Sequence, residues 1–130
     1  MNTETMNDHN AEKGTNDYYN LQFLYEIGDK EYIAEIIDIF LSTTPVTLKE
    51  IKEHIHQQNW EDAAKGAHKL KSGLGALQMN QMLSSITAIE TIAKQKSGVE
   101  QLPALADEAL HQYTLVEPML KAELEKARGE

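Results

Sequence analysis

The sequence of 130 residues contains no cysteine, which excludes disulfide bonds and thiolate-ligated zinc. It has one arginine and a formal net charge of −9, so it lacks the dense cationic stripe of a nucleic-acid-binding protein. No apolar run approaches the roughly 20 residues that span a bilayer, and the start, MNTETMNDHN, does not resemble a signal peptide. We therefore expect a cytoplasmic protein that binds neither nucleic acid nor membrane.

The alternation of apolar and polar residues that is typical of strands is also missing. Apolar residues recur instead at spacings of three and four, which predicts an all-α protein. The expected fold is an antiparallel four-helix bundle that follows a short N-terminal helix over about 20–27; its four helices cover about 30–57, 60–77, 79–96 and 102–126. Pro45 falls inside the first of the four, which we interpret as one kinked helix, with a break into two helices as the alternative.

Residues 1–17 contain no Leu, Ile, Val or Phe, and this composition predicts a disordered polar tail. Residues 18–130 then form a single domain, which we expect to be monomeric. Asp17 or Asn20 can cap the short helix, Gly28 can stop it, and Asp29 can cap the next one.

Residues 63–77, AAKGAHKLKSGLGAL, are the most informative part of the sequence. At about 100° per residue, one arc about 80° wide forms a predicted buried stripe, and His68 lies roughly 140–150° from its middle. The stripe consists of Ala63, Ala67, Leu70, Leu74 and Leu77. We therefore expect His68 to face solvent. An unperturbed imidazole is largely neutral at cellular pH, so its free ring nitrogen is an available nucleophile.

Small residues surround His68 on the outer face of this helix: Ala64, Ser72 and Gly75 lie four residues before, four after and seven after it. Lys71 is the one long side chain close beside it. No acidic residue occurs between Asp62 and Glu90. A level surface with an accessible imidazole and a local positive charge favours a protein partner that brings an anion, and a phosphoryl group is the obvious candidate.

Glu90 lies among apolar residues of the next predicted helix. If the helical hairpin turns near Met79, two residues equally far from Met79 along the chain lie level with each other. His68 and Glu90 are each 11 residues from Met79, so Glu90 should lie beside His68. Its carboxylate can accept a hydrogen bond from one ring nitrogen and leave the other as the nucleophile. The competing interpretation is a carboxylate that reaches water from the flank of its helix.

The string His68-Lys69-Leu70-Lys71-Ser72-Gly73-Leu74 resembles the H-x-L-K-[GS] signature of histidine-containing phosphotransfer (HPt) domains of two-component phosphorelays. The resemblance extends over about residues 20–127. It departs from the common pattern at Ser72 and at Gln78, where many members have glycine. Many members also carry Gln or Glu 22 residues after the histidine, as this chain does at Glu90.

The resemblance implies a carrier that accepts a phosphoryl group on His68 from the aspartyl phosphate of a receiver domain and passes it to another receiver. Lys71 would neutralise the phosphoryl group, and the docking surface would be formed by Ala64, Lys65, Lys69, Ser72 and Gly75. The expected partners are receiver domains of response regulators and a hybrid histidine kinase. No cofactor or metal is expected on this chain, because the Mg²⁺ would belong to the receiver, and the chain would not be an enzyme in its own right.

Two other functions compete with this one. Glu53 with His56 and Glu108 with His111 have the spacing of di-iron bundle ligands, but both pairs should face water, so we reject an oxidase. A bundle that only docks partners, without phosphorylation, is the remaining alternative. His54, His56 and His111 are expected at the surface and His9 in the tail.

Overall fold

The computed structural model describes residues 14–129, and most of them are helical. Five α-helices and one 3-10 helix follow each other along the described chain: α2 (Gln22–Ile27), α3 (Lys30–His56), α4 (Trp60–Ala76), α5 (Asn80–Gln95), η1 (Val99–Gln101) and α6 (Leu102–Gly129). Within these residues the only β-pairing is an isolated bridge between Thr15 and Asn20. The all-α prediction is confirmed.

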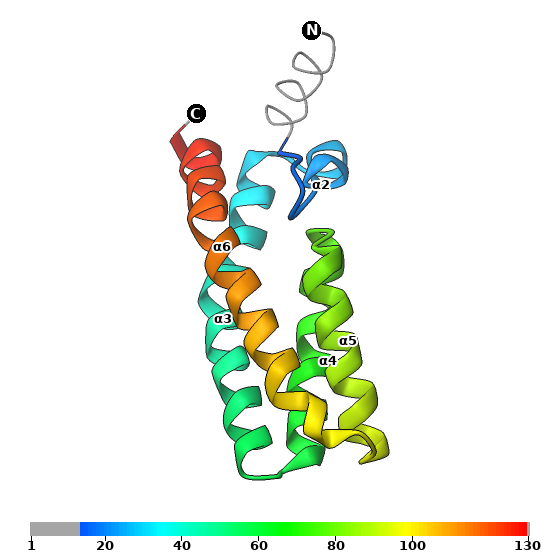
Figure 1. The fold of residues 1–130 in the computed structure, drawn as a ribbon. Helices are drawn as coiled ribbons and strands as arrows, with labels where there is room; N and C mark the ends of the chain where they lie inside the picture. Colours follow the sequence, from blue (N-terminus) through cyan, green and yellow to red (C-terminus); the bar gives the residue numbers. More distant parts are fainter. Residues whose placement is uncertain (1–13, 130) are drawn as a thin grey trace, which may run out of the picture.

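The four long helices run alternately in opposite directions (Figure 1). Helix α3 packs against α4 and α6, and α5 packs against the same two helices. Helices α4 and α6 therefore occupy opposite corners of the bundle. This is the predicted antiparallel four-helix arrangement, and it leaves one side of α4 without a covering helix.

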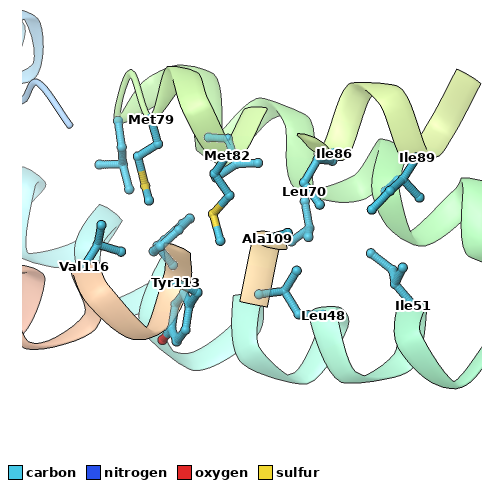
Figure 2. Packing of buried hydrophobic residues seen from close by; sticks show 14 of the residues in the cluster. Leu48, Ile51, Leu70, Met79, Met82, Ile86, Ile89, Ala109, Tyr113 and Val116 are labelled. Carbon is cyan, nitrogen blue, oxygen red and sulfur yellow. The ribbon is translucent and has the colours of Figure 1, made fainter. Parts of the chain in front are cut away.

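The core lies along the axis between the four long helices, where apolar side chains from all of them meet (Figure 2). Met82 and Tyr113 belong to this core, and the Tyr113 ring lies 6.0 Å from that of Phe40 in a tilted arrangement. The predicted stripe of α4 is buried, namely Ala63, Ala67, Leu70 and Leu74, with Leu77 at the C-cap, and Ala64 beside it is buried as well. The opposite side of α4 is thereby turned outward.

Side chains predicted as caps accept hydrogen bonds at the N-termini of α2 and α3. The Asp29 carboxylate accepts a hydrogen bond of 2.9 Å from the Tyr32 N–H at the start of α3, and the Asn20 side chain accepts one from the Gln22 N–H. Gly28 ends α2. Helix α3 continues through Pro45, so the interpretation as one helix is right and a break into two is wrong.

Three helices end on non-glycine residues in the left-handed region: Gln58, Gln78 and Lys96, with φ of 60°, 51° and 55°. This conformation costs an ordinary residue about 1–2 kcal/mol, and glycine is the usual choice at a helix end. Gln78 is one of the two positions where this chain departs from the common HPt pattern. Gln78, in the turn between α4 and α5, therefore adopts the left-handed conformation that glycine favours, although it is a glutamine.

The segment before α2 belongs to the fold, which corrects the predicted tail of residues 1–17. The Leu21 N–H donates to the Gly14 carbonyl, and the Asn20 N–H donates to the Leu77 carbonyl at 3.0 Å. The Tyr19 hydroxyl donates to Glu123 on α6 at 3.1 Å. Residues 14–17 are thus part of a turn that closes one end of the bundle, and the rest of the predicted tail lies outside the described residues.

Helix α6 extends to Gly129, three residues beyond the predicted end at 126. Near this end Ala127 is buried, and Arg128 forms an ion pair of 3.3 Å with Asp38 on α3. These contacts join residues far apart in the sequence, so the periodicity of α6 alone did not reveal them.

Two glycines of α4 should respond in opposite ways to alanine. A Cβ on Gly66 would lie 2.7 Å from Cγ1 of the buried Ile51, whereas a Cβ on Gly75 would meet nothing within 4 Å. We expect Gly66→Ala to lower the free energy of unfolding by about 1–3 kcal/mol through overpacking, and Gly75→Ala to raise it by up to about 1 kcal/mol through helix propensity. Chemical denaturation measures both, and equal effects would contradict the close approach of α3 and α4 at Gly66.

Candidate functional site

His68 projects from the outer side of α4, and 70% of its side chain is exposed. The sequence predicts this position because the buried stripe of α4 lies on the other side of the helix. An exposed imidazole on a rigid helix is accessible to another protein without any rearrangement of the core.

Glu90 approaches His68 from α5. Its Oε2 lies 2.7 Å from His68 Nδ1, and only 7% of the Glu90 side chain is exposed. The predicted juxtaposition of these two residues is therefore present. Because an ionised carboxylate can only accept hydrogen bonds, Nδ1 carries the proton in this contact. Nε2 is then the ring nitrogen with a free lone pair.

Two lysines complete the surroundings of the Glu90 carboxylate. Lys71 Nζ lies 2.9 Å from Oε1, and Lys94 Nζ lies 3.3 Å from Oε2. The hydrogen bond from Lys71, together with those from His68 and Lys94, outweighs the opposing effect of burial and lowers the pKa of Glu90 from 4.5 to about 2. Glu90 is thus ionised throughout the physiological range.

Lys94 was missed by the sequence reasoning. A signal existed, because Lys94 follows Glu90 by four residues, a spacing at which oppositely charged side chains on a helix interact. Lys71 was predicted beside His68, and the structure adds that its amine bonds to Glu90. The role expected of Lys71, to neutralise a phosphoryl group, stays a prediction.

The five predicted docking residues do not all share the exposed face. Lys65, Lys69, Ser72 and Gly75 are exposed, but Ala64 is buried, with 4% of its surface accessible. The prediction that Ala64 lies on the outer face is wrong, because α5 packs closely against α4 on that side. Ala64 instead lines a groove next to His68.

Two grooves flank this face. One, of about 540 Å³, lies between α4 and α5, and its lining includes His68, Glu90, Lys65, Lys94 and Lys96. The other, of about 240 Å³, lies between α3 and α4; three apolar residues and two threonines of α3 line it, together with α4 residues that include the exposed Lys69 and Ser72. The imidazole therefore stands at the edge of a groove that carries three lysines.

The residues of the di-iron alternative are not brought together. Glu53, His56, Glu108 and His111 are all exposed, and residues 14–129 contain no group of three or more potential ligands that could hold a metal ion. His54 differs from expectation, because it is half-buried and its Nδ1 has no hydrogen-bond partner among the described residues. His9 lies outside them. No described helix is long and apolar enough to cross a membrane.

The geometry agrees with a comparison against protein families. A family described as the Hpt domain matches residues 35–130, which is most of the chain. The chain belongs to the Hpt domain family. Neither a curated protein nor a solved structure matches it significantly. Hpt domains are phosphotransfer carriers of phosphorelays rather than classical enzymes, and they interact with receiver domains of response regulators.

The lowered pKa of Glu90 predicts a specific loss of stability in acid. Its ionised form is favoured in the folded state, so its contribution is fully present above the ordinary pKa of 4.5 and is lost as the pH falls through about 2. We expect the free energy of unfolding of the wild type to fall more steeply over this window than that of Glu90→Gln. Denaturation at a series of pH values measures the slopes. Glu108→Gln, at an exposed site, should follow the wild type, and a Glu90→Gln curve parallel to both would contradict the lowered pKa.

Proposed function

We propose that this chain accepts a phosphoryl group on Nε2 of His68 from the aspartyl phosphate of a receiver domain and passes it to a second receiver. One observation carries the proposal: His68 is exposed while its Nδ1 is bonded to the buried carboxylate of Glu90. This contact selects Nε2 as the nucleophile and holds the ring in a fixed orientation on α4.

The transfer step follows from this arrangement. The Nε2 lone pair forms a bond to phosphorus while the bond from phosphorus to the aspartyl oxygen breaks, and the aspartate leaves with that electron pair. The proton on Nδ1 stays in place, and the positive charge that develops on the ring is stabilised by Glu90, which is ionised. The reverse reaction, on a second receiver, regenerates the neutral imidazole.

The phosphoryl group brings negative charge close to the lysines of the site. Lys71 and Lys94 lie within hydrogen-bonding or ion-pair distance of the same carboxylate that bonds His68. Their positive charges favour an anion at Nε2 by an electrostatic effect that grows as the partner excludes water. The Mg²⁺ that phosphoryl transfer generally uses is expected on the receiver.

His68→Gln should abolish phosphoryl acceptance and leave the helical fold intact, because residue 68 lies outside the core. The measurement is incubation with a phosphorylated receiver domain, followed by detection of an acid-labile, base-stable label on this chain. His111→Gln changes another exposed histidine and should behave as the wild type. Label that persists on His68→Gln would place the acceptor elsewhere, and stable binding to the receiver without any label would favour the adaptor.

Glu90→Ala should impair His68 without unfolding the bundle. In the wild type, ¹⁵N NMR of the neutral ring should show the proton on Nδ1, and the variant should lose this preference. Transfer should slow by roughly 10- to 100-fold as the ring becomes misoriented. Glu90→Gln should retain more activity, because the amide oxygen can still accept the hydrogen bond. Unchanged tautomer and rate in Glu90→Ala would remove Glu90 from the site.

A further inference from the structure

A third groove, of about 480 Å³, lies at the end of the bundle that carries the α3–α4 and α5–α6 connections (Figure 1). Its lining comes from the end of α3, the start of α4, η1 and the start of α6. None of the residues that line it also lines either groove beside His68. An occupant of this third groove therefore does not compete with a partner for the lining of the other two.

Apolar side chains form much of this lining. They are the buried Ile55 and Ala106, the half-buried Trp60 and Val99, and the exposed Pro103. Trp60 is the one tryptophan of the chain, and an aromatic ring that is only half-buried has apolar area left to cover. Covering such a ring removes more apolar surface from water than covering a smaller side chain does. The groove thus offers an anchor for an apolar group.

The α6 side of the groove is acidic. Residues 97–120 contain four acids and neither a lysine nor an arginine. Two of these acids, Glu100 and Asp107, line the groove, and Asp107 forms an ion pair of 3.1 Å with Lys52, the one lysine of the lining. Glu100 is exposed and forms no ion pair within residues 14–129. This side therefore favours a positively charged group beside Glu100.

The α3–α4 connection adds an amide to the lining. Gln58 follows the end of α3, and its exposed side chain lines the groove. A glutamine amide both donates and accepts hydrogen bonds, so it matches the N–H and C=O groups of a peptide backbone. A peptide uses the apolar lining, the amide and the carboxylate together, whereas an inorganic cation uses only the carboxylates. The combination of the three favours a peptide as the occupant.

We propose that this groove binds a short segment of a partner protein in which an apolar or aromatic side chain stands next to a lysine or arginine. The apolar side chain covers Trp60 and Val99, the basic one lies beside Glu100, and the amide of Gln58 bonds the backbone of the segment. The inference goes beyond the proposed function and does not depend on it. Because the lining is separate from that of the grooves beside His68, the chain can hold this segment while a receiver reaches the imidazole.

Trp60 makes the occupancy of the groove measurable, because no other tryptophan contributes to the fluorescence of the chain. The full-length chain is used to select binders from a random library of short displayed peptides. Enriched peptides should combine an aromatic or large aliphatic residue with lysine or arginine. An enriched peptide that contains no tryptophan is then synthesised and titrated into the chain, and the emission of Trp60 should shift to shorter wavelength as the ring leaves water.

Variants test the two contacts separately. Glu100→Lys should weaken binding of the peptide roughly tenfold at low salt and much less at high salt, because salt screens exposed charges. Glu125→Lys is the matched control: it makes the same change in net charge at an exposed site near the other end of α6, and it should bind as the wild type does. Val99→Ser should weaken binding to a similar extent at both salt concentrations, since it removes apolar contact. Circular dichroism checks that each variant is folded.

Several outcomes would overturn the proposal: a library without enriched peptides, enriched peptides that lack basic residues, equal effects of Glu100→Lys and Glu125→Lys, or binding that leaves the emission of Trp60 unchanged. An emission that changes with protein concentration alone would assign the groove to a second copy of this chain instead. Saturating peptide should leave phosphoryl acceptance on His68 unchanged, and loss of label would contradict the independence of the two sites. A chain that binds the peptide but accepts label from no receiver would overturn the proposed function and leave the groove assigned.

Discussion

The buried carboxylate of Glu90 is the group on which the rest of the site depends. A carboxylate removed from water is strongly unfavourable unless cations and hydrogen-bond donors surround it. Here α4 supplies His68 and Lys71, and α5 itself supplies Lys94. A shift of either helix along the other would leave the charge without these partners. The requirement to neutralise one acid therefore ties the register of the α4–α5 pair to the orientation of the imidazole.

The small residues of α4 matter for its packing against its neighbouring helices. Gly66 allows α3 to approach closely at Ile51, and Ala63, Ala64 and Ala67 are buried where the neighbouring helices pack. This packing leaves Glu90 close enough to bond His68 from the next helix. Of the three small residues that were expected to serve a partner's approach, Ala64 instead serves the internal packing of the bundle, whereas Ser72 and Gly75 are exposed.

The fold could be predicted because its information is local: apolar spacing, helix caps and short connections. The contact between Glu90 and His68 could be predicted as well, since a helical hairpin with a known turn fixes which residues are level. The sequence did not reveal that the amines of Lys71 and Lys94 both contact the Glu90 carboxylate. The direction of a long lysine side chain depends on its charged neighbours in three dimensions. The turn at residues 14–17 was missed for a similar reason: it joins the fold through backbone hydrogen bonds, from the Leu21 N–H to Gly14 and from the Asn16 N–H to Tyr19, which composition does not encode.

The interval without acids between Asp62 and Glu90 becomes a surface only through the fold. In an extended chain Lys65, inside this interval, and Lys94, just beyond it, would lie far apart, but the antiparallel pairing of α4 and α5 brings both to one groove. The acid that ends the interval, Glu90, is buried and held ionised by cations, so it does not cancel the positive charge that a partner meets. A protein with a formal net charge of −9 can therefore present lysines around one histidine, because no acid occurs between Asp62 and Glu90 and the carboxylate of Glu90 is engaged within the hairpin.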